Sequence, residues 1–251
     1  MKMVLCVKMV RAGLMAQSRP GDETYVMNPY DLLALTRMVD FKKTEEDKVV
    51  CMSMGGEQIG EALVKCYAMG ADEVYWMKDE AFAGSDTVAT SYILSHAIRR
   101  LEGYDLVVCG AKSMDGETGQ VGAGIAERLG IPLLTGAEEL LASDVSSVTV
   151  RVSDETSGRI VKIGLPALIA FRDFTMTADI SLFGLKKARR KEIRILDAKA
   201  LMLETARCGF KGSKTAVVSI RSNMEKKEAR TVDGDVRKKV QVLKDMMDFR
   251  R

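Results

Sequence analysis

Histidine, proline and tryptophan are scarce in this chain. Among its 251 residues are one histidine, His96, four prolines and one tryptophan. A single histidine, placed among helical residues, argues against a histidine-built metal site and a histidine-containing catalytic triad. No grouping of a nucleophile with a base is visible either, so we expect neither a catalytic residue nor a bound metal ion in this chain.

Long apolar runs are absent as well. Apolar residues make up 47% of the chain, yet no run of them approaches the roughly 20 residues that a membrane-spanning helix needs. Residues 1–7 contain one lysine and a short apolar stretch without a small-residue cleavage site, which indicates a buried strand rather than a signal peptide. We therefore expect no membrane span and a cytoplasmic location.

Cysteine occurs in an odd number and never as a CxxC pair. The five cysteines lie mostly within apolar runs, at Cys6, Cys51, Cys66, Cys109 and Cys208. This pattern favours reduced core thiols over disulfides or zinc ligands.

Short runs rich in β-branched residues alternate with amphipathic stretches of helical period. Apolar side chains at Ile59, Ala62, Leu63 and Cys66 follow the i, i+3, i+4, i+7 spacing of a helix that covers a sheet. The alternation predicts an α/β protein with a doubly wound, mainly parallel sheet. Its expected strands are residues 3–7, 48–52, 73–77, 105–109 and 167–171, with an added antiparallel hairpin at residues 148–152 and 159–163.

The alternation fades after about residue 196. We therefore expect a nucleotide-binding domain at residues 1–195 and a C-terminal arm at residues 196–251. The arm ends in an amphipathic helix with Val236, Val240, Leu243 and Met247 on one face. Such a tail has little core of its own, so it is expected to pack on its own domain or on a partner.

The loop at residues 109–124 carries the most informative functional signal. It leaves an expected strand at Cys109 and enters an expected helix near Gln120. Its glycines allow close approach of the backbone, and free amides in the first turn of that helix would attract a phosphate. The loop is neither a Walker loop nor a GxGxxG segment directly after a strand. On the residues alone, an anion-binding loop and a glycine-rich turn without function both remain open.

Two further helix starts are more easily explained by structure than by function. Asn28 can cap a helix with Pro29 at its first position and Asp31 near its positive end. In the same way, Ser85 or Asp86 can cap the expected helix that starts directly after them.

Basic residues crowd the segment 185–194. A solvated face is the default interpretation and an acidic protein partner is the next. Nucleic acid is disfavoured because no aromatic platform accompanies the segment and the net charge is only +3. The preceding segment, expected to be a loop, contains Leu182 and Phe183, which would either tuck into the core or serve as a docking anchor.

Taken in order along the chain, these segments resemble the electron-transfer flavoprotein β-subunit family. The resemblance covers nearly the whole chain and rests on the joint order and spacing of its motifs rather than on any one of them. The motifs are residues 28–31, 68–72, 84–87, 104–110, 115–122, 165–167 and 186–191.

The resemblance implies a Rossmann-like domain that holds an adenine nucleotide. The nucleotide is AMP in ordinary members and a second FAD in electron-bifurcating members, and the small residues of the turn at 115–121 favour FAD here. The amides of Gln120, Val121 and Gly122 would bind its phosphate. The implied cofactor-binding residues are Cys6, Asn28, Pro29, Tyr30, Asp31, Met54, Gly110, Ala111, Lys112, Asp115, Thr118, Gly119, Gln120, Val121 and Gly122.

The resemblance also implies partners. The arm would pack on an α subunit that carries a further FAD, and Leu182 falls where the family has a leucine that anchors dehydrogenases, here an acyl-CoA or related dehydrogenase. The heterodimer would pass electrons between dehydrogenases and other carriers, with an NADH-linked bifurcating reaction open if the nucleotide is FAD. Two segments, residues 8–13 and 175–183, depart from the family pattern. In the first of them, Arg11 would place positive charge near the partner's flavin.

Two rival functions follow from the same residues. One is an adenine-nucleotide-binding regulatory or sensor module without a redox role. The other is an ATP-dependent enzyme, which would need a phosphate loop and metal ligands that the sequence lacks.

Overall fold

The computed structural model describes residues 1–14, 23–101, 103–153, 157–216, 218 and 231–248. The chain divides into two compact units, Met1–Ala216 and Val217–Arg251. The first unit contains the sheet and all of the candidate site.

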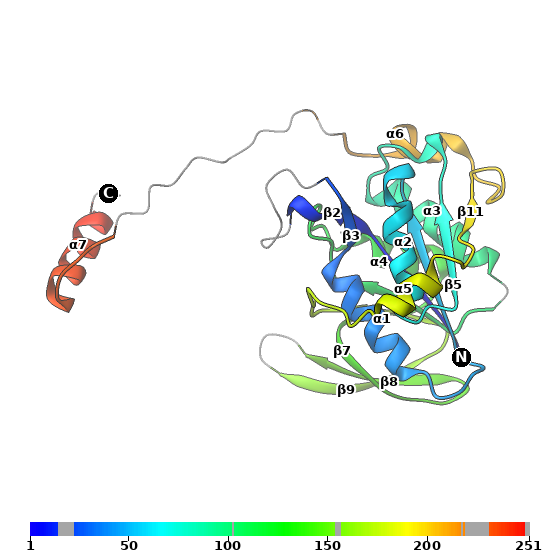
Figure 1. Ribbon diagram of the computed structural model, residues 1–251, viewed down its shortest axis with the longest axis horizontal. Coiled ribbons are helices and arrows are strands. Elements are labelled where there is room, and N and C mark those ends of the chain that lie inside the picture. Colours follow the sequence, from blue (N-terminus) through cyan, green and yellow to red (C-terminus); the bar gives the residue numbers. More distant parts are fainter. Residues whose placement is uncertain (15–22, 102, 154–156, 217, 219–230, 249–251) are drawn as a thin grey trace. The chain divides into compact units, whose positions relative to one another are not determined.

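A nine-stranded sheet forms the centre of the first unit, with the strands in the order β11-β5-β4-β1-β6-β10-β7-β8-β9. Figure 1 shows β8 and β9 at the bottom of this unit, away from β11 and β5. Neighbouring strands run parallel from β11 to β7, and β7, β8 and β9 form an antiparallel extension. This architecture confirms the predicted fold class. The strands are β1 (Lys2–Cys6), β4 (Lys48–Met54), β5 (Glu73–Met77), β6 (Leu106–Gly110), β7 (Leu133–Ser143), β8 (Ser147–Ser153), β9 (Gly158–Gly164), β10 (Ala167–Phe171) and β11 (Arg194–Leu196), with β2 (Met9–Arg11) and β3 (Tyr25–Met27) paired separately.

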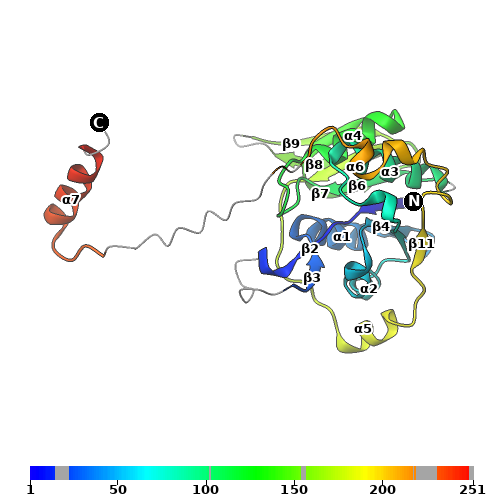
Figure 2. The ribbon, with the colours of Figure 1, turned by 90° about the horizontal axis from the view of Figure 1, so that it is seen from above.

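Helices cover both faces of the sheet because its strands alternate apolar side chains between two cores. Leu5 of β1 joins a buried cluster with residues of α1 and α2, whereas Val4 joins a cluster with residues of α3 and α4. Helix α5 packs outside this layer, against α2 (Figure 2). The helices are α1 (Pro29–Phe41), α2 (Gly60–Ala68), α3 (Thr87–Arg100), α4 (Gln120–Leu129), α5 (Leu182–Ala188), α6 (Gly209–Gly212) and α7 (Val236–Asp248), with short 3-10 helices at Ala12–Leu14, Glu57–Ile59, Glu80–Phe82 and Thr205–Arg207.

The strands that the sequence pattern did not predict are the polar or short ones. Strand β7 carries two glutamates and is interrupted by Gly136 at φ 77° and by irregular register against β8 and β10, so it has no apolar run. Strands β2, β3 and β11 have three residues each. Such strands are defined by their neighbours rather than by their own periodicity.

Residues 197–216 pack on the first unit, although the sequence pattern assigned them to the arm. Leu201 and Cys208 are buried in the core beneath α3 and α4. Asp86 caps α3 by accepting from the Val88 and Ala89 amides through Oδ1, and its Oδ2 accepts from the backbone of residues 214 and 215 at 2.6 and 3.0 Å. The compact unit therefore ends at Ala216, about 20 residues beyond the boundary that the fading alternation suggested.

The second unit contains α7. The apolar side chains of Val236, Val240 and Leu243 are exposed on this helix, and the side chain of Met247 lies outside the described residues. None of the helices in the described ranges combines the length and the apolar character needed to cross a membrane.

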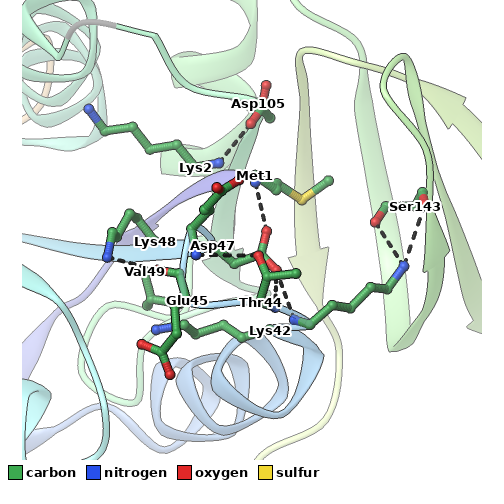
Figure 3. A network of polar contacts seen from close by, with 12 residues as sticks. Met1, Lys2, Lys42, Thr44, Glu45, Asp47, Lys48, Val49, Asp105 and Ser143 are labelled. Carbon is green, nitrogen blue, oxygen red and sulfur yellow. Dashed lines mark hydrogen bonds and ion pairs between the residues drawn. The ribbon is translucent and has the colours of Figure 1, made fainter.

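Carboxylates hold the amino ends of the central strands (Figure 3). The N-terminal ammonium of Met1 donates to Asp47 Oδ1 at 2.7 Å, and the Lys2 amide donates to Asp105 Oδ2 at 2.7 Å. This network fixes the start of β1 at the edge of the sheet opposite to the candidate site.

Candidate functional site

The strand order reverses between β1 and β6. From β1 the chain proceeds to β4 and β5 on one side, and then crosses to β6 and β10 on the other. Cys6 and Cys109 are paired in register near the carboxyl ends of these two strands, so the loops that follow them diverge from the same place. In doubly wound sheets this switch point is where ligands bind.

The start of α1 joins the two diverging loops through Asp31. This buried carboxylate accepts the Lys8 amide at Oδ2 (2.8 Å) and the Gly110 amide at Oδ1 (3.0 Å). Burial raises the pKa of Asp31 to about 7, although these hydrogen bonds act in the opposite direction. Asp31 therefore positions the backbone of both loops, and each of its oxygens already faces a protein amide.

Asn28 has a similar role and does not cap α1, contrary to the expectation from its position. Its side-chain amide donates to the Lys112 carbonyl at 2.9 Å, and its side-chain oxygen accepts from the Met114 amide at 3.2 Å. Pro29 and Tyr30 occupy the first turn of α1 beside this contact, as predicted. Asn28 thus shapes the loop after β6.

Gly110 lies where no side chain fits. A Cβ on this residue would come within 2.5 Å of both Asp31 Oδ1 and the Tyr30 Cβ. The next amide, of Ala111, donates to the Phe171 carbonyl at 2.7 Å. Glycine is required here because α1 approaches the end of β6 closely.

The loop at residues 111–119 closes on itself and leads directly into α4. Glu117 and Gly119 both have left-handed backbone, with φ of 52° and 63°. A Cβ on Gly119 would lie 3.0 Å from the Ala111 carbonyl oxygen, so the two ends of the loop meet. Among the described residues no side chain caps α4, which begins at Gln120. The first-turn amides of Gln120, Val121 and Gly122 are therefore the groups at this site best suited to an anion.

Apolar side chains lie beneath these amides. Cys6, Cys109 and Met54 belong to the same apolar cluster, at the carboxyl ends of β1, β6 and β4. The hydrogen bond to Cys6, together with burial, raises the pKa of the Cys109 thiol. All five cysteines are buried and unpaired, as their apolar surroundings predicted. In the described part of the chain no cluster of histidine, cysteine, aspartate or glutamate is arranged to hold a metal ion.

Charged side chains surround the loop. Lys8 Nζ lies 2.7 Å from Asp115 Oδ1, and Lys112 Nζ lies 3.8 Å from Glu117 Oε2. Thr118 is exposed on the same loop. Lys8 was not among the predicted site residues, although a basic residue two positions after the end of β1 was a visible signal.

Thr87 is a second residue that sequence reasoning missed. Its hydroxyl donates to the Gln120 side-chain oxygen at 3.1 Å, which links the start of α3 to the start of α4. Thr87 belongs to one of the family motifs, residues 84–87, but only the spatial proximity of the two helices reveals this contact.

Leu182 and Phe183 begin α5, where the sequence suggested a loop. Both side chains project into solvent, with 88% and 79% of their surface exposed. Ser181 Oγ caps the helix by accepting from the Gly184 amide at 2.9 Å. Arg11, on β2, donates to the Tyr25 hydroxyl at 3.4 Å, and this contact raises its pKa.

Comparison with known proteins relates this chain to the electron transfer flavoproteins. A model of the electron transfer flavoprotein domain matches residues 21–201. The chain is 35% identical over 235 residues to the electron transfer flavoprotein subunit beta of Megasphaera elsdenii, covering 88% of this chain and 87% of the relative. It is 34% identical over 234 residues to the protein FixA of Azotobacter vinelandii, covering 88% and 83%. It is also 31% identical over 226 residues to the caffeyl-CoA reductase-Etf complex subunit CarD of Acetobacterium woodii, covering 86% of each chain.

Proposed function

Because this chain belongs to the electron transfer flavoprotein β-subunit family, we propose that it binds an adenine nucleotide at the β1–β6 switch point and acts as the small subunit of a heterodimer. The uncapped start of α4 is the observation that carries this proposal. The α subunit of the heterodimer carries a FAD, and the pair passes electrons between dehydrogenases and other carriers, in the cytoplasm.

The residues at the switch point fit a nucleotide. Amides of Gln120, Val121 and Gly122 offer hydrogen bonds and the positive end of the α4 dipole to a phosphate. Gly122 is buried, and a Cβ there would meet Cys109 at 3.6 Å, so α4 packs closely on the end of β6. Cys6 and Met54 provide apolar surface for the rest of the ligand.

The remaining predicted ligand residues act chiefly through the backbone. Asn28 and Asp31 hold the loops after β1 and β6 in place, and Gly110 allows α1 to approach them. Pro29, Tyr30, Ala111, Lys112, Asp115, Thr118 and Gly119 complete the surroundings of the nucleotide. The site is therefore organised before the ligand arrives, which lowers the entropic cost of binding.

We favour FAD over AMP as the nucleotide. The turn at residues 115–121 consists of small and polar residues. One relative is named as a subunit of a caffeyl-CoA reductase-Etf complex. A bound flavin would supply redox chemistry; the residues of this chain bind and orient it and carry out no bond chemistry of their own. With FAD bound, the heterodimer is suited to NADH-linked electron bifurcation.

Two other surfaces serve the partners. In this proposal the C-terminal arm packs on the α subunit through α7. The exposed apolar side chains of Val236, Val240 and Leu243 support this assignment. Leu182, exposed at the start of α5, docks on an acyl-CoA or related dehydrogenase.

The proposal is tested by co-expressing the chain with its α subunit and measuring the nucleotide content of the purified complex. Two FAD per heterodimer support the bifurcating form, and one FAD with one AMP supports a simple carrier. A colourless chain that binds nucleotide without a partner would instead support a sensor. A complex in which this chain holds no nucleotide would refute the proposal.

A matched pair of variants tests the phosphate site itself. Gln120→Glu adds a negative charge at the first residue of α4, which favours the helix but repels a phosphate. Gln120→Ala removes the same side chain and its bond to Thr87 without adding charge. We expect Gln120→Glu to bind nucleotide about tenfold more weakly and Gln120→Ala to stay within about threefold of wild type. Equal binding by all three proteins would place the phosphate elsewhere.

A further inference from the structure

One ion pair spans the switch point. Lys8 follows β1 and Asp115 lies in the loop after β6, and their charged atoms are 2.7 Å apart. The Lys8 main chain is fixed, because its amide donates to Asp31 and its carbonyl accepts from the Asn28 amide at 2.9 Å. The Lys8 side chain is therefore the movable part of this contact.

The Asp115 carboxylate is held by more than Lys8. The Gly116 amide donates to the same Oδ1 at 2.8 Å. Burial would raise the pKa of Asp115, but Lys8, Ser113 and the Gly116 amide together lower it below its ordinary value. Asp115 is therefore held in the loop by the Gly116 amide as well as by Lys8.

The pair is exposed enough to exchange partners. The side chains of Lys8 and Asp115 keep 49% and 33% of their surface exposed. Ion pairs of this kind contribute little to stability because water and salt screen them. A phosphate can replace the carboxylate on the Lys8 ammonium, because a charge-assisted hydrogen bond to a phosphate oxygen is strong and even a singly charged phosphate group offers several acceptor oxygens.

We propose that Lys8 is a phosphate ligand that Asp115 holds in the absence of nucleotide, and that Asp115 makes the site prefer the singly charged phosphates of a pyrophosphate to a terminal phosphate. This inference rests on the proposed function. The phosphate replaces the Asp115 carboxylate on the Lys8 ammonium, and the displaced carboxylate stays in the loop beside it.

The preference follows from the charge of each phosphate group. A terminal phosphate monoester, as in AMP, carries close to two negative charges at pH 7. Each phosphate of the FAD pyrophosphate is bonded through one ester oxygen and one anhydride oxygen, and carries one negative charge. Repulsion from Asp115 scales with the charge on the nearest phosphate, so it disfavours AMP more than FAD.

The test uses the heterodimer with its α subunit and compares AMP with FAD. Displacement titrations followed by chromatography of the bound nucleotide give the half-saturating concentration of each. We expect Asp115→Asn to bind AMP at least threefold more tightly and FAD less than twofold more tightly. Lys8→Met is expected to weaken both about tenfold, and Lys8→Arg to restore most of the loss.

The control is Glu45→Gln, which removes the same charge from an exposed side chain at the opposite edge of the sheet and is expected to leave both affinities unchanged. Melting temperature and the FAD content of the α subunit check that each variant is folded. If wild-type heterodimer binds nucleotide on this chain but Asp115→Asn changes AMP and FAD equally or not at all, the inference is refuted and the proposed function survives. If wild type binds neither nucleotide, the proposed function itself is refuted.

Discussion

The two edges of the parallel sheet use the same group, an aspartate that accepts backbone and terminal N–H groups, to opposite effect. At the amino edge, Asp47 contacts the N-terminal ammonium and the amides of residues 43 and 44, and these bonds lower its pKa to about 2 (Figure 3). At the carboxyl edge, Asp31 accepts two amides but is buried, and its pKa is raised to about 7. The amino edge is held by Asp47, a charged carboxylate with hydrogen-bond donors around it. The carboxyl edge is held by Asp31, a buried carboxylate whose ionisation costs free energy.

The contacts at the amino ends of the strands serve stability, whereas those at the carboxyl ends shape the candidate site. At the amino edge, Asp47 pairs with the N-terminal ammonium and Asp105 accepts the Lys2 amide, so both carboxylates hold the start of β1. At the carboxyl edge the bonds of Asn28 and Asp31 fix the loops that follow β1 and β6, and the first amides of α4 are uncapped by any side chain in the described ranges. Buried polar contacts at this edge therefore fix the backbone of the proposed nucleotide site.

The largest effect is expected from adding a methyl group at the carboxyl edge. Gly110→Ala places a Cβ 2.5 Å from Asp31 Oδ1 and from the Tyr30 Cβ, both of which are packed. We expect this variant to lose about 3 kcal/mol of unfolding free energy and to bind nucleotide more weakly than wild type. Urea unfolding measures the first, and Gly116→Ala is the control because its Cβ would make only an ordinary 3.5 Å contact with Ser113. Equal stability of the two variants would show that α1 does not approach the end of β6 as described.

A smaller loss, with a characteristic pH dependence, is expected from Asp31→Asn. An amide group in place of the carboxylate leaves one of the Lys8 and Gly110 amides without an acceptor, at a cost of about 1–3 kcal/mol. The folded pKa of Asp31 is raised, so its contribution to stability falls as the pH rises from about 4 to about 7. Urea unfolding at pH 5 and pH 8 should therefore show the variant closer to wild type at pH 8. An identical difference at both pH values would contradict the raised pKa.

At the amino edge, the stability contributed by Asp47 should have the opposite pH dependence to that of Asp31. The folded pKa of Asp47 is lowered, so its stabilisation is present above pH 4 and is lost as the pH falls from about 4 to about 2. Asp47→Asn should melt several degrees below wild type at pH 7 and almost together with it near pH 2. Thermal unfolding across this range measures the effect, and a gap that widened on acidification would exclude the assigned contact with Met1.

The smallest effect on stability is expected at a residue that belongs to neither edge. Leu182 is 88% exposed, so Leu182→Ala should leave the unfolding free energy within about 0.5 kcal/mol of wild type. The same variant should transfer electrons from its dehydrogenase more slowly, measured as reduction of the heterodimer flavin. Arg151→Ala, exposed on β8, is a control for a surface change elsewhere. Unchanged transfer by Leu182→Ala would remove this residue from the docking surface.

The sequence was sufficient for the parts of the fold that repeat locally. The five expected strands appear within two residues at each end, and α4 begins at Gln120 where the glycine loop predicted it. The pattern could not show that Asn28 would bond to Lys112, 84 residues away, instead of capping its own helix. It could not show that residues 197–216 complete a core, because their buried side chains are spaced too irregularly for a helix or strand. Both features depend on contacts between distant segments.

The hydrogen bonds between Asp86 and residues 214 and 215 affect how the first unit would bear a pulling force. The chain leaves the first unit just after Thr215, whose amide and hydroxyl both donate to Asp86 Oδ2. Tension applied to the following residues is therefore first borne by the cap of α3 rather than by a strand at the sheet's margin. Helix α3 in turn packs on α4, and Thr87 contacts Gln120 while Arg128 contacts Ser91. The point where the chain leaves the first unit is therefore connected, through packed helices, to the start of α4.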